Sequence, residues 1–299
     1  MTNLPVLLII YDRFDTTAQV LEVLKQVQPP RLYIASDAGH TPDVHQKVLA
    51  CRNDTEQAID WICEIKTRYL TVNEGPRFGV GGAITWFFEQ EERGVVLEHD
   101  CVPLPEFFTF CEHYLEVLKD DLRIFHLGGN NYLPQGTVAP AAYLSRYNHI
   151  WGFASWARAW KNYDVHLNQL EQWLEEDWVS EMLPDREERA YWFKRLRQLK
   201  AGEVRSWDYP WTLAMWRNRA MALLPGTNMV RNVGFGEQSL HSQDSSHPLN
   251  HLKISAPPQA AWPKPEALTY RADLDHAVFR HIYRPPLWLR AIRKWRARS

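Results

Sequence analysis

Short apolar runs alternate with helical patterns through the first 127 residues, and this alternation constrains the fold more than any other feature of the chain. Each run has the length and the continuous apolar character of a strand that is buried on both faces. The runs lie at 5–10, 31–35, 68–72, 95–98 and 123–127. Because the intervals between them are long enough for helices, we expect right-handed crossovers and an α/β fold with a mostly parallel central sheet flanked by helices.

Helices are expected in the intervals between these strands, at 15–27, 55–65 and 105–118 and from residue 83 onward. In parallel sheets, ligands bind beyond the carboxyl ends of the strands. Polar residues follow every predicted strand, which makes this edge of the sheet the first candidate for a functional site. These residues are Tyr11, Asp12, Arg13, Ser36, Asp37, Asn73, Glu74, His99, Asp100 and Asn130.

The second half of the chain has a different character. Residues 151–216 are rich in tryptophan and in charged residues at helical spacing, and 221–225 has the pattern of a strand. No internal repeat or clear linker is visible in the sequence. We therefore expect residues 1–242 to form one α/β domain with a Trp-rich helical elaboration. Residues 243–299 are expected to form a loop-rich extension that ends in a basic amphipathic helix.

The composition is notable for 14 tryptophans in 299 residues, with a formal net charge of -2. An exposed indole has a flat apolar face that matches the CH groups of a sugar ring, although core packing is the usual role of any single tryptophan. The near-neutral charge argues against electrostatic attraction of the whole protein to nucleic acid.

The cysteines and the N-terminus bear on the cellular compartment. Cys51, Cys63, Cys101 and Cys111 lack the paired spacing of a metal site and are typical of reduced core residues. The apolar run at 7–10 is too short for a signal peptide or a membrane span. These features predict a cytoplasmic protein.

The sharpest motif is the strand at 95–98, which delivers Glu98 and Asp100 to its carboxyl end. Mn²⁺ and Mg²⁺ prefer carboxylate oxygens, and one protein carboxylate can suffice when phosphate oxygens and water complete the coordination. Such a cation neutralises the negative charge that develops on a departing diphosphate. Asp100 is the predicted ligand, with Glu98 beside it or acting through water. A turn-forming Asp at a strand end is the alternative.

The segment 98–108, Glu-His-Asp-Cys-Val-Pro-Leu-Pro-Glu-Phe-Phe, resembles the Glu-Asp-Asp…Pro…Phe-Phe signature of the nucleotide-diphospho-sugar transferases of GT-A fold. Within that family it is similar to N-acetylglucosaminyltransferase I and to related bacterial sugar transferases. The chain departs from the family pattern at three positions. His99 stands in place of the middle acid of the signature, Phe153 stands where relatives commonly have Trp, and Leu240 stands where they have Thr. Further segments fit the family pattern in order and spacing across residues 5–242, and they lie at 11–17, 34–39, 79–88, 149–156, 206–211 and 228–236.

The resemblance implies a GT-A type, Rossmann-like domain that transfers a sugar from a nucleotide-diphosphate sugar, with a UDP-sugar favoured. The acceptor would be a hydroxyl of a glycan or a lipid-linked glycan, and the cofactor Mn²⁺ or Mg²⁺. Arg77 offers a bidentate fork for the diphosphate, and glycines ahead of a helix start let the backbone approach an anion. A capping Asp37 and a merely flexible glycine loop are the alternatives. The donor nucleotide is expected to contact Asp12, Arg13, Asp37, Arg77, Gly81, Gly82 and His99.

Asp208 is the predicted general base of an inverting transfer. A carboxylate in this role takes the proton of the acceptor hydroxyl on the side opposite the leaving diphosphate. The neighbouring aromatic residues would partly desolvate Asp208 and raise its basicity. Trp207 and Trp211, together with Trp151 and Gly152, are expected to bind the acceptor sugar. An Asp that simply begins the following helix is a compatible alternative.

Two further features lie toward the C-terminus. His241 is predicted as an additional metal or diphosphate contact, because imidazole is a usable Mn²⁺ ligand, and a solvent-exposed loop histidine is the alternative. Residues 280–298 combine arginines with Leu and Trp, as in a basic helix that lies on an anionic membrane. This predicts contact with the inner face of the membrane, and a terminal helix docked on the protein body is the alternative.

Other functional classes fit the sequence less well. No G-x-G-x-x-G follows the first strand, which argues against an NAD-dependent dehydrogenase. The clustered His and Asp ligands of a two-metal phosphohydrolase are also missing. His99 keeps one rival open, a catalytically weak or inactive member of the same fold that only binds a nucleotide sugar or a glycan.

Overall fold

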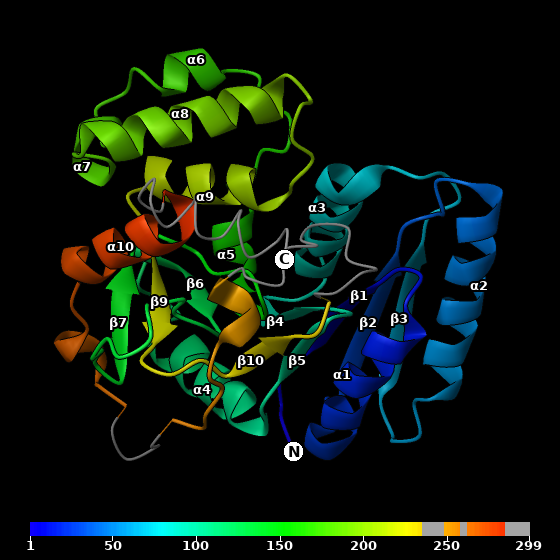
Figure 1. Cartoon of the computed structure of the whole chain (residues 1–299). Helices are drawn as coiled ribbons and strands as arrows, with labels where there is room; N and C mark the ends of the chain where they lie inside the picture. Colours follow the sequence, from blue (N-terminus) through cyan, green and yellow to red (C-terminus); the bar gives the residue numbers. More distant parts are fainter. Residues whose placement is uncertain (235–247, 258–261, 285–299) are drawn as a thin grey trace, which may run out of the picture.

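The computed structural model describes residues 1–234, 248–257 and 262–284, and its centre is an eight-stranded sheet with the order β3-β2-β1-β4-β8-β6-β9-β7 (Figure 1). Strands β3, β2, β1 and β4 are mutually parallel, β6 and β9 run the same way, and β8 and β7 run the opposite way. The predicted α/β class with a mostly parallel central sheet is confirmed. The strands are β1 (Val6–Ile10), β2 (Arg31–Ser36), β3 (Glu64–Tyr69), β4 (Arg93–Glu98), β6 (Ile124–Gly128), β7 (Ala142–Ser145), β8 (Phe153–Trp156) and β9 (Met221–Pro225).

Helices cover both faces of this sheet, and a layer of helices from the second half stands over one end of it (Figure 1). A second, two-stranded sheet pairs β5 (Cys101–Pro103) with β10 (Val230–Asn232). The α-helices are α1 (Phe14–Val27), α2 (Pro42–Gln57), α3 (Gly75–Phe88), α4 (Pro105–Val117), α5 (Ala157–Trp160), α6 (Leu170–Trp173), α7 (Trp178–Met182), α8 (Arg186–Lys200), α9 (Asp208–Arg217) and α10 (Ala272–Val278). Short 3-10 turns at Pro248–His251 and Pro265–Ala267 and a π-helical turn at Phe279–Tyr283 complete the described chain.

Strand β1 shows why an unbroken apolar run forms the middle of the sheet. Leu7 and Ile9 point into a core that they share with α3, whereas Val6, Leu8 and Ile10 enter a second core built with α1 and α4. Alternate side chains of one strand are thus buried on opposite faces, which is the situation that selects continuous apolar sequence. The carboxyl end of β1 is thereby fixed beside the carboxyl end of β4.

Several predicted boundaries are wrong, and each has a local cause. The helix expected at 55–65 lies earlier, as α2, because Thr41 accepts a hydrogen bond from the Val44 amide and Pro42 begins the helix. The strand expected at 68–72 is β3, and its exposed edge position gives it little apolar signal. Helix α3 begins at Gly75 rather than after Gly82. Strands β7 and β8 lie in sequence that carried no strand prediction.

A buried ionic cluster ties the C-terminal segment to the rest of the molecule. Arg146, which follows β7, pairs with Glu188 of α8 (3.2 Å) and with Asp275 of α10 (3.2 Å), and all three side chains are buried. Ser145 Oγ also donates to Asp275 (2.5 Å), and the Tyr147 hydroxyl donates to Glu188. Desolvation raises the pKa of Asp275 to about 6, and the Ser145 and Arg146 contacts oppose that rise.

Arg146→Met is expected to lower the free energy of unfolding by about 3–5 kcal/mol, because it leaves two buried carboxylates without their cation. Urea denaturation at pH 7 measures this loss. Arg197→Met is the matched control, since Arg197 pairs with Glu171 (2.7 Å) at a site where both side chains are more than half exposed. The control should cost less than about 1 kcal/mol. Equal losses for the two variants would contradict a structural role for the buried cluster.

Candidate active site

Two carboxylates at the carboxyl end of β4, Glu98 and Asp100, lie close enough to a third from the start of α9, Asp208, for both Asp100 and Asp208 to act electrostatically on Glu98. Glu98 is the last residue of β4 and pairs with Ile9 of β1, and Asp100 lies in the turn that leads into β5. Asp208 is the first residue of α9, and the Ser206 hydroxyl donates a hydrogen bond to its carboxylate. The sheet edge predicted from the sequence thus brings Glu98 and Asp100 near Asp208, a residue from the second half of the chain.

The electrostatics of Glu98 reflect how close these groups are. Its pKa is raised to about 8, and burial is the largest cause of that rise, followed by the negative charge of Asp100 and, to a smaller extent, that of Asp208. A hydrogen bond from the Trp207 side chain opposes the shift. Glu98 is therefore protonated at neutral pH unless a positive charge enters the cluster. A concentration of acidic groups with this property favours a bound cation.

Arg13 supplies a cationic group near the same cluster. It precedes α1, and its Nη2 donates to Asp15 at 2.8 Å. This hydrogen bond raises the pKa of Arg13, and the negative charges of Asp100 and Asp12 raise it as well. The end of β1 therefore brings Asp12 and Arg13 near Asp100, and their contact with the donor stays a prediction. His99 lies between the acids, with its amide bonded to the Ile9 carbonyl (2.8 Å).

The residues at this cluster have the chemistry that a hard divalent cation needs, but they offer few protein ligands. Glu98 and Asp100 offer carboxylate oxygens, which Mn²⁺ and Mg²⁺ prefer, and a diphosphate and water would have to complete the coordination sphere. Within the described ranges, no group of three or more His, Cys, Asp or Glu side chains gathers as a complete metal site. The predicted contact His241 lies outside the described residues.

Asp37 has a structural role that competes with the predicted nucleotide contact. Its Oδ2 accepts hydrogen bonds from the amide of Gly75 (2.7 Å) and from the Asn73 side chain (3.2 Å), and its Oδ1 accepts from the amides of Ala38 and Glu74. These bonds occupy the lone pairs of the carboxylate and cap the start of α3. The capping alternative therefore describes Asp37 in this structure.

Arg77 is not placed to meet a diphosphate, and this prediction is corrected. Its Nε donates to the Val165 carbonyl (3.0 Å), its Nη1 to the Leu199 carbonyl (2.7 Å) and its Nη2 also to Val165. The side chain is buried, and desolvation lowers the pKa of the guanidinium. Arg77 thus anchors α3 to the loop before α6 and to the last turn of α8, a role that its sequence context does not indicate.

The prediction that the backbone at Gly81 and Gly82 binds an anion is also wrong, because both glycines lie inside α3 rather than ahead of it. From the fifth residue of a helix onward, each amide is bonded to the carbonyl four residues earlier and is not free for a ligand. The missing side chains serve close packing instead. A Cβ on Gly81 would lie 2.6 Å from the Tyr163 hydroxyl, and one on Gly82 would lie 3.1 Å from Arg68 Nη2.

The predicted acceptor platform is largely buried. Trp211 is fully buried and donates from Nε1 to His126 Nδ1 (3.3 Å), and Trp207 stacks on Phe153 with the ring centroids 5.6 Å apart. Neither indole can offer an open face to a sugar, so their predicted role as a platform is wrong. Trp207 reaches the site through Glu98 instead. Trp151 is partly exposed and remains a candidate acceptor contact.

Gly152 has a backbone role at this place. Its φ is +65°, in the left-handed region, and its carbonyl accepts from the Gly129 amide (2.9 Å). A Cβ would lie 3.0 Å from Val230 and 3.2 Å from Leu97, so a side chain would press on β10 and β4. Gly152 therefore shapes the floor of the site and remains only a proposed acceptor contact.

Two buried histidines beneath the cluster were missed by sequence reasoning. His126 of β6 and His149 are fully buried, and burial lowers the pKa of each to about 3. Since the Trp211 indole can only donate, His126 Nδ1 must accept, and the proton lies on Nε2, which donates to the His149 carbonyl (3.2 Å). Only the neutral ring satisfies both bonds. The sequence held one sign of this, because His126 interrupts the otherwise apolar strand β6.

We expect the free energy of unfolding of wild type to fall by about 2 kcal/mol more than that of His126→Phe when the pH is lowered from 7 to 5. Below about pH 6.5 the unfolded chain binds a proton at His126 and the native state does not, so the stability that neutral His126 confers is lost on acidification. The raised pKa values of Glu98 and Asp275 increase the stability of the native state as the pH falls, but they do so equally in wild type and in the variant. Urea midpoints at pH 7, 6 and 5 measure the difference, and a constant difference would contradict the neutral assignment.

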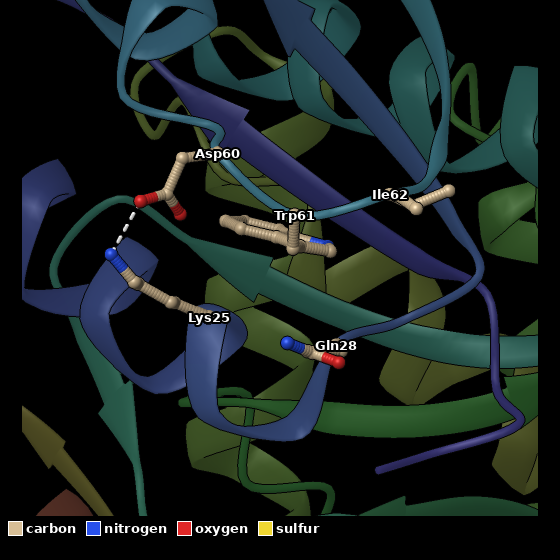
Figure 2. A pocket seen from close by; sticks show the side chains of 5 residues that line it. All are labelled: Lys25, Gln28, Asp60, Trp61 and Ile62. Carbon is tan, nitrogen blue, oxygen red and sulfur yellow. Dashed lines mark hydrogen bonds and ion pairs between the residues drawn. The ribbon is translucent and has the colours of Figure 1, made fainter.

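Two cavities lie away from the three carboxylates. One pocket, of about 350 Å³, lies beside the end of α1. Lys25 and Asp60 form an ion pair there (2.5 Å), near Trp61 and the exposed Ile62 (Figure 2). An open groove of about 720 Å³ runs along α3, between Phe78 and Trp86 on one side and Tyr163 on the other. Tyr163 also donates to the Trp207 carbonyl (3.2 Å), so the groove backs onto the candidate site.

Similarity to known proteins is found among solved structures, whereas no family model and no curated protein matches the chain. HddC from Yersinia pseudotuberculosis is similar over 55% of this chain and 80% of its own, with 11% identity and a TM-score of 0.33. A UDP-glucose pyrophosphorylase complexed with UDP-glucose is similar over 74% of this chain and 90% of its own, with 8% identity and a TM-score of 0.35. These scores assign neither a family nor an activity.

The length and polarity of the helices decide whether any of them could span a membrane. Every helix in the described parts of the chain is too short or too polar to cross a lipid bilayer. The basic tail that prompted the prediction of peripheral contact falls mostly at 285–298, outside the described residues.

Proposed function

We propose that the protein is a glycosyltransferase that moves a sugar from a nucleotide-diphosphate sugar to a hydroxyl of a glycan, with a divalent cation as cofactor. The observation that carries this proposal is the convergence of Glu98, Asp100 and Asp208 at the carboxyl ends of β1 and β4. The family resemblance of residues 98–108 supports it independently. A UDP-sugar is the favoured donor, and a lipid-linked glycan is among the acceptors that the proposal allows.

On the donor side, the cluster would hold the diphosphate. Glu98 and Asp100 would ligate the cation, which supplies positive charge to the departing diphosphate. Arg13 adds a permanent positive charge at the end of β1 and would face phosphate oxygens, while Asp12 and His99 would lie along the nucleoside. Binding of the cation would deprotonate Glu98, because positive charge beside a carboxyl favours its ionised form.

On the acceptor side, Asp208 would act as the general base. It belongs to α9, whereas the donor groups belong to the ends of β1 and β4, and it would approach the sugar from the side opposite the diphosphate and remove the proton of the attacking hydroxyl. The Ser206 hydroxyl holds one carboxylate oxygen of Asp208 and so limits its rotation. Attack from this side inverts the configuration of the transferred sugar. Trp151 would contact the acceptor.

A screen of nucleotide sugars by thermal shift, with Mn²⁺ or with EDTA, tests the proposal, since a ligand that binds only the native state raises the melting temperature. We expect one nucleotide family to stabilise the protein when Mn²⁺ is present and not when it is chelated. Incubation with the stabilising donor and a glycan mixture should then release free nucleoside diphosphate. Stabilisation without any turnover would favour the rival, a binding protein in which His99 has replaced a needed acid. The absence of stabilisation by any nucleotide sugar would refute both.

A further inference from the structure

The carboxylate of Asp100 lies against the backbone of Gly234, in the loop that follows β10. A Cβ at this glycine would lie 2.1 Å from Asp100 Oδ2 and 2.9 Å from Asp100 Cγ. The φ of Gly234 lies outside the left-handed region, so backbone conformation does not require glycine here. The residue is small because the carboxylate occupies the space that a side chain would need.

A chain of weak and ordinary hydrogen bonds reaches Asp100 from the same loop. The antiparallel register of β5 and β10 places Asn232 opposite Cys101, and the Val233 amide donates to the Asp100 carbonyl (2.8 Å). Asn232 accepts from the Gly234 amide through Oδ1 (2.8 Å) and lies 3.8 Å from Cys101 Sγ through Nδ2. The Cys101 thiol in turn donates to Asp100 Oδ1 (3.4 Å).

We infer that Gly234 and Asn232 are positioning residues for Asp100, which set the direction in which its carboxylate faces a divalent cation. One oxygen is held by Cys101, and the other is confined by the bare Cα of Gly234. Asn232 in turn fixes the loop, because its side chain bonds to the Cys101 thiol and to the Gly234 amide. This inference rests on the proposed function, in which Asp100 is a ligand of the cation. Groups that orient a metal ligand typically change metal affinity by about 10–100-fold when they are removed.

The test is a titration of Mn²⁺ into the full chain, followed by the electron paramagnetic resonance signal of free Mn²⁺, which requires no turnover. Gly234→Ala would push the Asp100 carboxylate out of its position, and we expect it to weaken Mn²⁺ binding by about 10-fold or more. Asn232→Ala adds no bulk and removes only the support, so it should weaken binding in the same direction. Thermal melting in EDTA shows whether each variant is folded.

Gly202→Ala is the control for loss of stability alone. Gly202 has a φ of +78°, and no heavy atom lies within 4 Å of the place where its Cβ would stand, so alanine there strains the backbone without touching the site. Its Mn²⁺ affinity should equal that of wild type. If wild type binds Mn²⁺ and both loop variants bind it equally well, the positioning role is wrong. If wild type itself does not bind Mn²⁺, even with a nucleoside diphosphate present to complete the coordination sphere, the proposed function fails instead.

Discussion

Asp208→Asn is expected to lower kcat for sugar transfer by about 10²–10⁴-fold while the KM for the donor stays close to that of wild type. The amide has the size of the carboxylate and can still accept from Ser206, but it cannot take the proton of an acceptor hydroxyl. Because this residue enters from α9 and the donor groups from the ends of β1 and β4, the change should spare donor binding.

Steady-state kinetics with the donor found by the thermal-shift screen measure both parameters. Asp177→Asn is the matched control, since Asp177 is an exposed residue before α7 whose side chain does not cap that helix. The control should keep the wild-type kcat. An Asp208→Asn enzyme that turns over within about twofold of wild type would show that another group is the base.

Asp100→Ala is expected to abolish the Mn²⁺-dependent part of donor binding, a loss of about 10²-fold or more in affinity. A cation contributes several kcal/mol of charge stabilisation to a bound diphosphate, and the variant removes the carboxylate that we propose as its main ligand. Glu98 alone would hold the cation poorly, because burial keeps its pKa near 8. Isothermal titration with the donor, in Mn²⁺ and in EDTA, measures the effect.

The two acids should differ in the measured quantity that their substitution changes, which is donor binding for Asp100 and turnover for Asp208. Asp100→Ala should impair binding in Mn²⁺ and leave the weaker binding in EDTA unchanged, whereas Asp208→Asn should impair turnover only. Asp60→Ala, at the exposed ion pair with Lys25, is the control for a lost carboxylate and should bind the donor as wild type does. Metal-dependent binding that survives Asp100→Ala would place the cation elsewhere.

The buried parallel strands of the central sheet were predictable from the sequence because burial on both faces leaves a continuous apolar signature. Val6–Ile10 and Met221–Pro225 are strands at the places where the apolar runs predicted them. The convergence of Glu98 with Asp12 and Arg13 follows from the same logic, since parallel neighbours end at one edge of a sheet. The position of Asp208 beside them depended on the family resemblance and not on any local pattern.

The parts that the sequence did not reveal depend on contacts between distant residues. Pro76 is the one local sign that α3 begins near Gly75, because the capping side chain, Asp37, comes from another loop. The glycines at 81 and 82 have the pattern of a phosphate loop, yet they make room for Tyr163 and Arg68. Trp207 and Trp211 carry no sign of whether an indole faces a sugar or the core, and the structure buries both.

The most direct test of this account is a crystal grown or soaked with Mn²⁺ and the nucleotide sugar identified by thermal shift, with the anomalous signal of manganese used to locate the metal. The account predicts one manganese peak bonded to the Asp100 carboxylate and to the diphosphate of the donor, with Asp208 facing the anomeric carbon from the other side. A donor whose diphosphate and manganese lie elsewhere, with Asp100 contacting only protein, would contradict it.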